Sequence, residues 1–409
     1  MEVRVQGSGG PRGWPEPGCR CAPCQRARTG GPGRAPFRVV VDGVLGLNGP
    51  HAAACGPIGA EPAREGTGIR GSGPEWPVGT ARDLAGHRVA RRAGGWDVTA
   101  SDGGRLLCAD GLGPAPALPP GTPRYDVALL DLLGDPAQLG RLRSQGAVTA
   151  RTVVAVAFAD HRVVSERELR RRARIWRVAA PRDGDVFRGP APVAAGGAGK
   201  TSGAGVTRAP HAPSDAAALA GGRPVPYRVL VLGGARSGKS AEAEMRVAAE
   251  PAVTYVATAP PVLPGEDPEW AAKIAAHRAR RPSWWQTLET TDLAGALRRA
   301  RGTVLVDSVT AWLAAVMDEC GAWDGSVGAA SRLGPRIAEL AGVWRQVSAY
   351  VVAVSDETGL GIVPETPAGR LFRDELGRLN QTLAAESEEV AVVIAGRLMT
   401  AGGTNFSRG

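Results

Sequence analysis

The second half of the chain has the more regular pattern of apolar and polar positions. Short apolar runs, typical of buried strands, alternate with amphipathic stretches that predict helices. The predicted strands are 228–232, 253–257, 303–307, 350–355 and 390–395, and the predicted helices are 239–250, 268–280, 292–299, 309–318, 335–347 and 370–386. Since this alternation is typical of parallel sheets covered on both faces, we expect an α/β domain over residues 227–409.

The first half shows a weaker pattern, with many Gly/Pro turns between short segments. The predicted strands are 3–6, 37–41, 127–130 and 153–157, and the predicted helix is 167–176. Residues 189–226 are rich in Ala, Gly, Pro and Ser and lack the large apolar side chains that offset the entropy of ordering. We therefore expect a first domain over 1–188 and a flexible linker over 189–226.

Composition narrows the classes of partner. The chain has 409 residues, a length typical of about two domains, and a formal net charge of +9. Its basic residues are scattered arginines, with only Lys200, Lys239 and Lys273 as lysines, so we expect phosphate-bearing small molecules and no nucleic-acid partner. No apolar run reaches the length of a membrane span and residues 1–10 have no signal-peptide core, so we expect a cytoplasmic protein.

The segment GGARSGKS lies between the first strand and first helix of the second domain and fits the pattern G-x-x-x-x-G-K-[ST]. Glycines let the backbone N–H groups of such a loop point at phosphate oxygens, and the following helix N-terminus favours negative charge. We expect Lys239 to reach the outer phosphates and the Ser240 hydroxyl to ligate Mg²⁺. The expected nucleotide-binding residues of the loop are Gly233, Gly234, Ala235, Arg236, Ser237, Gly238, Lys239 and Ser240.

A phosphate loop also needs an acid to hold its metal ion. Asp307, which ends the predicted strand TVLVD, is the candidate for a second Mg²⁺ ligand. The alternative is an ordinary strand-end or helix-capping aspartate, because Asp307-Ser308 precedes the next predicted helix. These features predict binding of ATP or GTP with Mg²⁺ and do not identify the reaction.

Five segments of the second domain occur in the order of one known family. They are GGARSGKS, TYVATA (254–259), AAKIAAHRARRP (271–282), WQTLE (285–289) and VSDETGLGIVPETPAGRLFRDELGRLNQTLAAESEEV (354–390). The last segment contains an E-x-G-x-G-I-V-P loop followed by R-x-F-R-D and G-R-x-N-Q. Together they resemble the adenosylcobinamide kinase/adenosylcobinamide-phosphate guanylyltransferase family, from about residue 227 to the last residue.

The resemblance implies a fold, a reaction and a set of site residues. The fold would be a P-loop, RecA-like, mostly parallel sheet. The chain would phosphorylate adenosylcobinamide with ATP or GTP, and His277 would then attack the GTP α-phosphate, expel pyrophosphate and pass GMP to adenosylcobinamide phosphate. Beside the catalytic pair His277 and Lys239, the implied nucleotide contacts are Thr258, Ala259, Pro260, Arg278, Arg280, Arg281, Glu289 and Asp307. A homo-oligomer, with a trimer expected, is implied as well.

The sequence departs from the family pattern in two places. Many relatives carry a glycine or an acid near Ala279 and Arg280, which puts the detailed contacts to the guanine or ribose in question. The family's asparagine in V-S-N-E is Asp356 here, which changes a local hydrogen bond.

The first domain opens with GSGGPRGWPEPGCRCAPC (7–24), which resembles the start of metallo-β-lactamase-fold hydrolases. Cys19, Cys21 and Cys24 are candidate ligands of a structural Zn²⁺, with a fourth ligand, such as a histidine, from elsewhere. The alternative is a set of free thiols in a Gly/Pro loop. Because the only Asp-His pair of this region is Asp160-His161 and no H-x-H-x-D-H run is present, we expect a degenerate αβ domain with a structural or assembly role.

Three other functions stay open at this point. One is a phosphate-loop kinase that does not transfer GMP, and such an enzyme would not need His277. Another is a module that binds nucleic acid without turnover, whose affinity would depend strongly on salt. The third is a metallohydrolase acting through the first domain, against which the missing histidine run counts.

Overall fold

The computed structural model describes residues 1–48, 55–57, 77–111, 118, 121–189, 206–207, 225–259, 272, 275, 278–279, 281–323 and 328–399. The chain forms two compact units, Met1–Gly222 and Arg223–Gly409. Most of the expected linker lies outside the described residues, so the division into 1–188, 189–226 and 227–409 stays a prediction. Residues Val206–Thr207, inside that range, form a short strand of the first unit.

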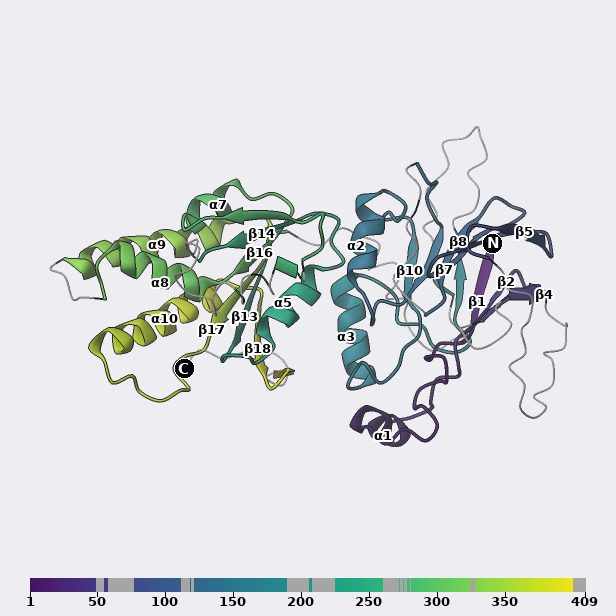
Figure 1. Cartoon of the computed structure of the whole chain (residues 1–409), viewed down its shortest axis with the longest axis horizontal. Helices are drawn as coiled ribbons and strands as arrows, with labels where there is room; N and C mark the ends of the chain where they lie inside the picture. Colours follow the sequence, from purple (N-terminus) through teal and green to yellow (C-terminus); the bar gives the residue numbers. More distant parts are fainter. Residues whose placement is uncertain are drawn as a thin grey trace. The chain divides into compact units, whose positions relative to one another are not determined.

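The described part of the first unit contains two six-stranded sheets (Figure 1). One has the order β12-β11-β1-β2-β3-β4 and is antiparallel throughout. Its strands are β1 (Glu2–Gly7), β2 (Arg38–Val41), β3 (Leu45–Asn48), β4 (Cys55–Pro57), β11 (Val186–Arg188) and β12 (Val206–Thr207). The other has the order β10-β9-β8-β7-β6-β5, with parallel pairing only along β8, β9 and β10. Its strands are β5 (Ala81–Leu84), β6 (His87–Arg92), β7 (Gly95–Thr99), β8 (Arg105–Ala109), β9 (Val127–Leu130) and β10 (Val153–Val156).

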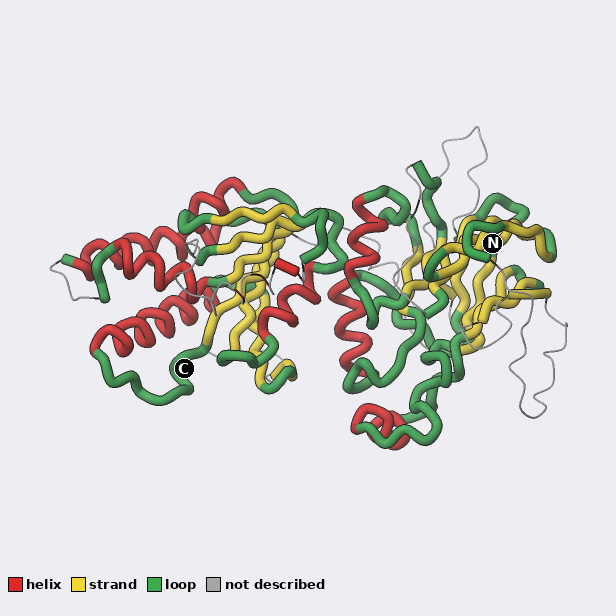
Figure 2. The backbone as a smooth tube through the Cα atoms, viewed as in Figure 1, coloured by secondary structure: helices red, strands yellow, loops and turns green. Residues whose placement is uncertain are grey.

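The two sheets of this unit share one core. Val3 and Val5 of β1 are buried while Arg4 between them is exposed, the alternation expected of a strand with one buried face. They belong to the same apolar cluster as Val89 and Val98 of the other sheet. The helices are α1 (Ala22–Thr29), α2 (Ala137–Ser144) and α3 (Glu166–Trp176). In Figure 2, α2 and α3 are the red helices that run along one side of the yellow strands of this unit.

The second unit is built on a seven-stranded sheet with the order β15-β14-β16-β17-β13-β18-β19. Its strands are β13 (Tyr227–Gly233), β14 (Val253–Ala257), β15 (Gln286–Glu289), β16 (Thr303–Asp307), β17 (Tyr350–Asp356), β18 (Glu389–Ile394) and β19 (Arg397–Met399). All neighbouring strands pair in parallel except β18 and β19. The predicted mostly parallel α/β architecture is confirmed.

Helices cover both faces of this sheet, as the continuous apolar strands predict. They are α5 (Lys239–Val247), α7 (Leu293–Arg299), α8 (Val309–Glu319), α9 (Ala329–Gln346) and α10 (Pro367–Ala385). One apolar cluster joins the sheet to α7, α8, α9 and α10, and another joins it to α5. Among the described residues, no helix is both long and apolar enough to span a bilayer.

In the first unit, the sequence prediction missed β3 to β8, β11, β12, α1 and α2. In the second unit, α9, β15 and β19 differ most from the prediction, and most of the predicted helix 268–280 lies outside the described residues. Helix α9 begins six residues before the expected start, and Pro335 lies inside it. The buried side chains of Ala329 and Leu333 in the extra turn join the core, which offsets the backbone hydrogen bond that proline cannot donate. Strand β15 was missed because all four of its residues are exposed, and β19 because it is a three-residue edge strand.

The salt bridges of Arg246 connect α5 to the sheet. Its side chain is 1% exposed, and it donates to Glu242 of the same helix (2.8 Å) and to Glu389 of β18 (2.7 Å). Replacement by alanine is expected to lower the free energy of unfolding by about 3 kcal/mol, because two partly buried carboxylates lose their partner. Urea unfolding measures this change. Arg298→Ala breaks an exposed pair with Glu339 and should cost under about 0.5 kcal/mol, so equal losses would contradict the prediction.

Candidate functional site

The carboxyl ends of the parallel strands gather the polar residues of the second unit. Gly233 ends β13, Ala257 ends β14, Glu289 ends β15, Asp307 ends β16 and Asp356 ends β17. Because these strands are parallel neighbours, their last residues lie along one edge of the sheet. This edge is where open α/β sheets bind ligands.

The phosphate loop follows β13 and turns directly into α5, as its sequence predicts. A side chain at Gly233 would place its Cβ 2.4 Å from Ser237 Oγ and 2.6 Å from the carbonyl oxygen of Val393, so only glycine fits there. Gly238 has a φ of 98° and precedes the first residue of α5, Lys239. The N–H groups of the first helical turn have no partners within the helix and are therefore available to an anion.

Lys239 lies against Asp356. The Nζ atom of Lys239 is 2.7 Å from Oδ1 of Asp356 and 3.3 Å from the carbonyl oxygen of Gly234. Asp356 is opposite Gly233 in the register of β13 and β17, which brings its carboxylate to the phosphate loop. In the sequence, Asp356 stands out only as a departure from the family pattern. The strand order, which places β17 next to β13, is the information that was missing.

Asp307 is held by residues of β14 and the segment after it. The Tyr255 hydroxyl donates a hydrogen bond to Asp307 Oδ2, and burial, together with the negative charge of Asp307, raises the pKa of Tyr255 above its ordinary value. Tyr255 therefore stays a hydrogen-bond donor at neutral pH. The Thr258 hydroxyl donates to the carbonyl oxygen of Ser308 (2.6 Å). The helix-capping alternative for Asp307 is wrong, because the side chain that caps α8 is Ser308, which accepts from the N–H of Ala311.

Two predicted arginines contact the edge of the sheet beyond β14. Arg278 forms an ion pair with Glu289 at the end of β15. The guanidinium of Arg281 lies 3.4 Å from the centroid of the Tyr255 ring. Tyr255 thus contacts both Arg281 and Asp307, and it is a site residue that sequence reasoning missed. His277, Arg280 and Pro260 lie outside the described residues.

Besides the Arg278–Glu289 ion pair, the described site residues form two groups of contacts. The phosphate loop contacts Asp356 through Lys239. Asp307, Arg281 and Tyr255 form the other group, with β17 lying between β16 and the phosphate-loop strand. Both groups occupy the carboxyl edge, so a nucleotide with its phosphates on the loop could extend across it.

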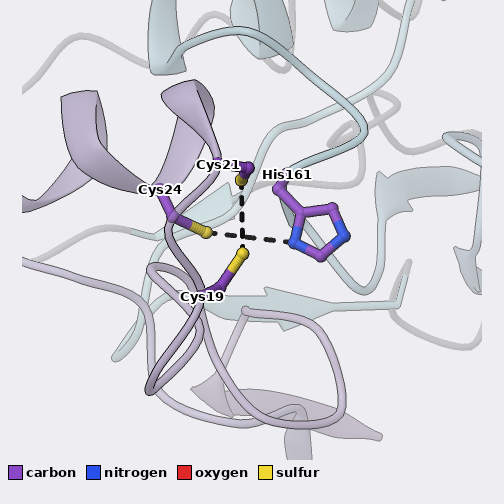
Figure 3. Close-up of side chains that lie close together, drawn as sticks. All are labelled: Cys19, Cys21, Cys24 and His161. Atoms are coloured by element: carbon purple, nitrogen blue, oxygen red, sulfur yellow. Dashed lines mark hydrogen bonds between the residues drawn. The ribbon is translucent and has the colours of Figure 1, made fainter.

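The first unit brings together the three cysteines at its N-terminus and one histidine. The sulfur atoms of Cys19, Cys21 and Cys24 and a ring nitrogen of His161 all lie within 4.8 Å of one another. Figure 3 shows these four side chains pointing toward a common centre. The Sγ atoms of Cys19 and Cys21 are 3.3 Å apart, and Cys24 Sγ is 3.9 Å from Nδ1 of His161. Three thiols and one imidazole form a donor set that suits tetrahedral Zn²⁺.

The surroundings of the cluster shift the pKa values of two of its thiols. Burial raises the pKa of Cys24 to about 11, whereas a hydrogen bond from the backbone N–H of Cys24 lowers the pKa of Cys21. A bound cation would favour the thiolate of Cys24, which is otherwise protonated at neutral pH. His161 is 137 positions from Cys24, so no local spacing could identify it. Its neighbour Asp160 pairs with Arg162 instead (2.8 Å).

Among the residues with a described position, the cluster is the only group of at least three His, Cys, Asp or Glu side chains close enough to share an ion.

Comparison with known proteins places the second unit in a family. The family described as cobinamide kinase / cobinamide phosphate guanyltransferase matches residues 229–401. The bifunctional adenosylcobalamin biosynthesis protein CobP of Pseudomonas aeruginosa is 42% identical over 177 residues, which cover 41% of this chain and 94% of that protein. The bifunctional adenosylcobalamin biosynthesis proteins CobU of Escherichia coli K12 and Salmonella typhimurium LT2 are each 37% identical, over 178 and 184 residues, and 96% of each is covered. With nearly the full length of these relatives matched, the chain belongs to the cobinamide kinase / cobinamide phosphate guanyltransferase family.

Proposed function

We propose that the second unit catalyses both reactions of its family, phosphorylation of adenosylcobinamide and transfer of GMP from GTP to adenosylcobinamide phosphate. The observation that carries the proposal is a complete phosphate loop on the same sheet edge as the described residues Asp307, Glu289 and Asp356 of the family's other segments. The ion pair of Arg278 with Glu289 and the stacking of Arg281 on Tyr255 join the segment that flanks position 277 to that edge.

In the guanylyl transfer, His277 is the proposed nucleophile. Its neutral imidazole attacks the α-phosphorus of GTP, a P–N bond forms, and the bond to pyrophosphate breaks. The phosphate of adenosylcobinamide phosphate then attacks the same phosphorus, so that GMP moves to the acceptor and the imidazole is regenerated. Lys239 and the loop N–H groups bind the phosphates and stabilise the charge that develops on them.

In the kinase step, the phosphate loop binds the triphosphate of ATP or GTP, and a hydroxyl of adenosylcobinamide attacks the γ-phosphorus. The new O–P bond forms as the bond between the γ-phosphorus and the β–γ bridging oxygen breaks, so that ADP or GDP leaves and the hydroxyl proton passes to water. Ser240, Asp307 and Asp356 supply oxygen donors at the carboxyl edge, the ligand type that suits Mg²⁺. This ion, when bound, would neutralise part of the phosphate charge. A RecA-like arrangement is supported by the position of β17 between β13 and the strand that ends at Asp307.

The proposal is tested with GTP labelled on the α-phosphate or on the γ-phosphate. After incubation with Mg²⁺ and denaturation, the α-label is expected to stay on the protein in a form that is stable to base and labile to acid, as a phosphoramidate is. The γ-label should leave with pyrophosphate. Absence of α-label on protein that still binds GTP would overturn the guanylyl-transfer step. The trimeric state and the cytoplasmic location stay predictions. Gel filtration with light scattering would test the first, and fractionation of cells would test the second.

We also propose that Cys19, Cys21, Cys24 and His161 bind one structural Zn²⁺, and that the first unit is a degenerate relative of metallo-β-lactamase-fold hydrolases with a structural role. The zinc proposal is supported by the tight donor set. These four residues would hold the ion without leaving a position for a catalytic water, as structural zinc sites do. The relationship to these hydrolases is supported by two packed sheets flanked by helices.

His161→Ala is expected to reduce the zinc content from about one ion per chain to less than about 0.2 after dialysis, because one of four ligands is lost. Metal content is measured by mass spectrometry. The matched control is Cys108→Ala, which removes a cysteine from the core between the sheets and should leave zinc in place. Equal zinc content in the wild type and the His161→Ala variant would contradict the proposed ligand set.

A further inference from the structure

The carboxylate of Asp356 lies against the phosphate loop. It is 2.7 Å from Nζ of Lys239, and the side chains of Lys239 and Asp356 are only 13% and 26% exposed. A lysine at this place in a phosphate loop binds phosphate oxygens of the nucleotide. In the structure, therefore, a carboxylate occupies the hydrogen-bonding position that a phosphate oxygen needs.

Asp356 is fixed through its backbone. Its N–H donates to the Thr310 hydroxyl (2.7 Å), and its carbonyl oxygen accepts from the Asn380 side chain (3.0 Å). The buried Ser355 hydroxyl in turn donates to the amide oxygen of Asn380 (2.7 Å). Strand β17 pairs with β13 as far as Asp356 and with β16 as far as Val354, so the backbone that carries this residue is held next to Gly233 of the loop.

A nucleotide that binds to the loop must then share the site with this carboxylate. Its phosphates would reach Lys239 while the negative charge of Asp356 stays within a few ångström, and like charges at that separation in a partly buried site repel strongly. A divalent cation between the two removes the repulsion, because carboxylate and phosphate oxygens are both ligands that Mg²⁺ accepts.

We propose that Asp356 makes nucleotide binding by this site depend on a divalent cation. Without the cation, its carboxylate holds Lys239 and repels the phosphates. With the cation, it becomes a metal ligand, directly or through water. The ligand class is a nucleoside triphosphate with its divalent metal, so the inference rests on the nucleotide binding in the proposed function. Beside Asp307, the proposed ligand of Mg²⁺, Asp356 is thus a second acid, and it makes nucleotide binding depend on the metal ion.

The test compares binding with and without Mg²⁺ for the wild type and the isosteric variant Asp356→Asn. Isothermal titration uses a GTP analogue with a non-cleavable α–β bridge, and inorganic tripolyphosphate as a second ligand, in Mg²⁺ or in EDTA. Mg²⁺ is expected to tighten wild-type binding about 100-fold. In EDTA, Asp356→Asn should bind each ligand about 10-fold more tightly than the wild type does. Addition of Mg²⁺ should raise the affinity of this variant by less than about 10-fold.

Asp318→Asn, an exposed change at the end of α8, is the matched control and should behave as the wild type. Thermal unfolding shows that each variant is folded, and Asp356→Ala provides a second variant with the same expected sign. An equal gain from Mg²⁺ in the wild type and both Asp356 variants would overturn the inference alone. Tripolyphosphate binding with the expected metal dependence, but without binding of the GTP analogue, would overturn the proposed use of GTP and leave the role of Asp356 standing. If the wild type binds neither ligand, both proposals fall.

Discussion

Alanine in place of His277 is expected to remove the α-phosphate label from the protein and to lower the rate of GMP transfer by at least about 10³-fold, because no other group replaces the nucleophile. Phosphorylation of adenosylcobinamide should be retained, since a direct transfer of the γ-phosphoryl group needs no covalent intermediate. The two half-reactions are measured separately, with adenosylcobinamide and ATP for the first and with adenosylcobinamide phosphate and GTP for the second.

The described neighbours of His277 provide the control. Arg278 binds Glu289 through an exposed ion pair, so Arg278→Ala removes a cation next to the nucleophile without disturbing a buried contact. This variant should keep the covalent label and lose rate by no more than about 10²-fold, the effect of one phosphate-binding donor. An unchanged amount of α-phosphate label on the His277→Ala variant would mean that another side chain is the nucleophile. Loss of both reactions would mean that His277 is needed for binding or folding.

Replacement of Lys239 by alanine is expected to lower both reactions by about 10³-fold, because each uses the same loop to bind phosphates whose charge is redistributed in the transition state. The effect differs from that of His277→Ala, which separates the two reactions. Steady-state rates of both half-reactions measure it, and nucleotide titration shows how much of the loss lies in binding.

Lys239→Arg tests whether charge alone is sufficient. The guanidinium keeps the positive charge but is a larger planar group, and the space beside Gly234 and Asp356 accommodates a compact ammonium. We expect this variant to recover less than about a tenth of the wild-type rate. Full activity in Lys239→Ala would show that Lys239 does not bind the reacting phosphates. Full activity in Lys239→Arg would show that a positive charge is sufficient at this position.

The fold of the second unit was largely predictable because its strands are buried on both faces. Continuous apolar runs such as YVVAV in β17 stand out from the amphipathic helices around them. The exposed residues of β15 carry no such signal, since an edge strand can be polar on both faces. Pro335 misled the prediction of α9, because proline is favoured in the first helical turn and tertiary contacts of Leu333 outweighed that local preference.

The candidate site was predictable where its chemistry is local in sequence. The eight residues of the phosphate loop carry their own pattern, and so do the clustered cysteines. The contacts between distant segments have no sequence pattern. The contact of Lys239 with Asp356 depends on the strand order, and the contact of Tyr255 with Asp307 depends on the pairing of two strands. The position of His161 beside the cysteines depends on the fold of the whole first unit. The residues that shape a site from neighbouring strands thus emerge only with the sheet topology.

The phosphate loop is completed by a part of the chain that the ribosome makes much later. The N–H of Gly396, in the turn between β18 and β19, donates to the carbonyl oxygen of Ser237 (2.7 Å). The Gly233 backbone, in addition, packs closely against Val393. During synthesis, residues 233–240 leave the ribosome more than 150 residues before these partners do. A nascent chain that ends before β18 should therefore be unable to hold a nucleotide, and binding competence should arise abruptly once the last hairpin has emerged.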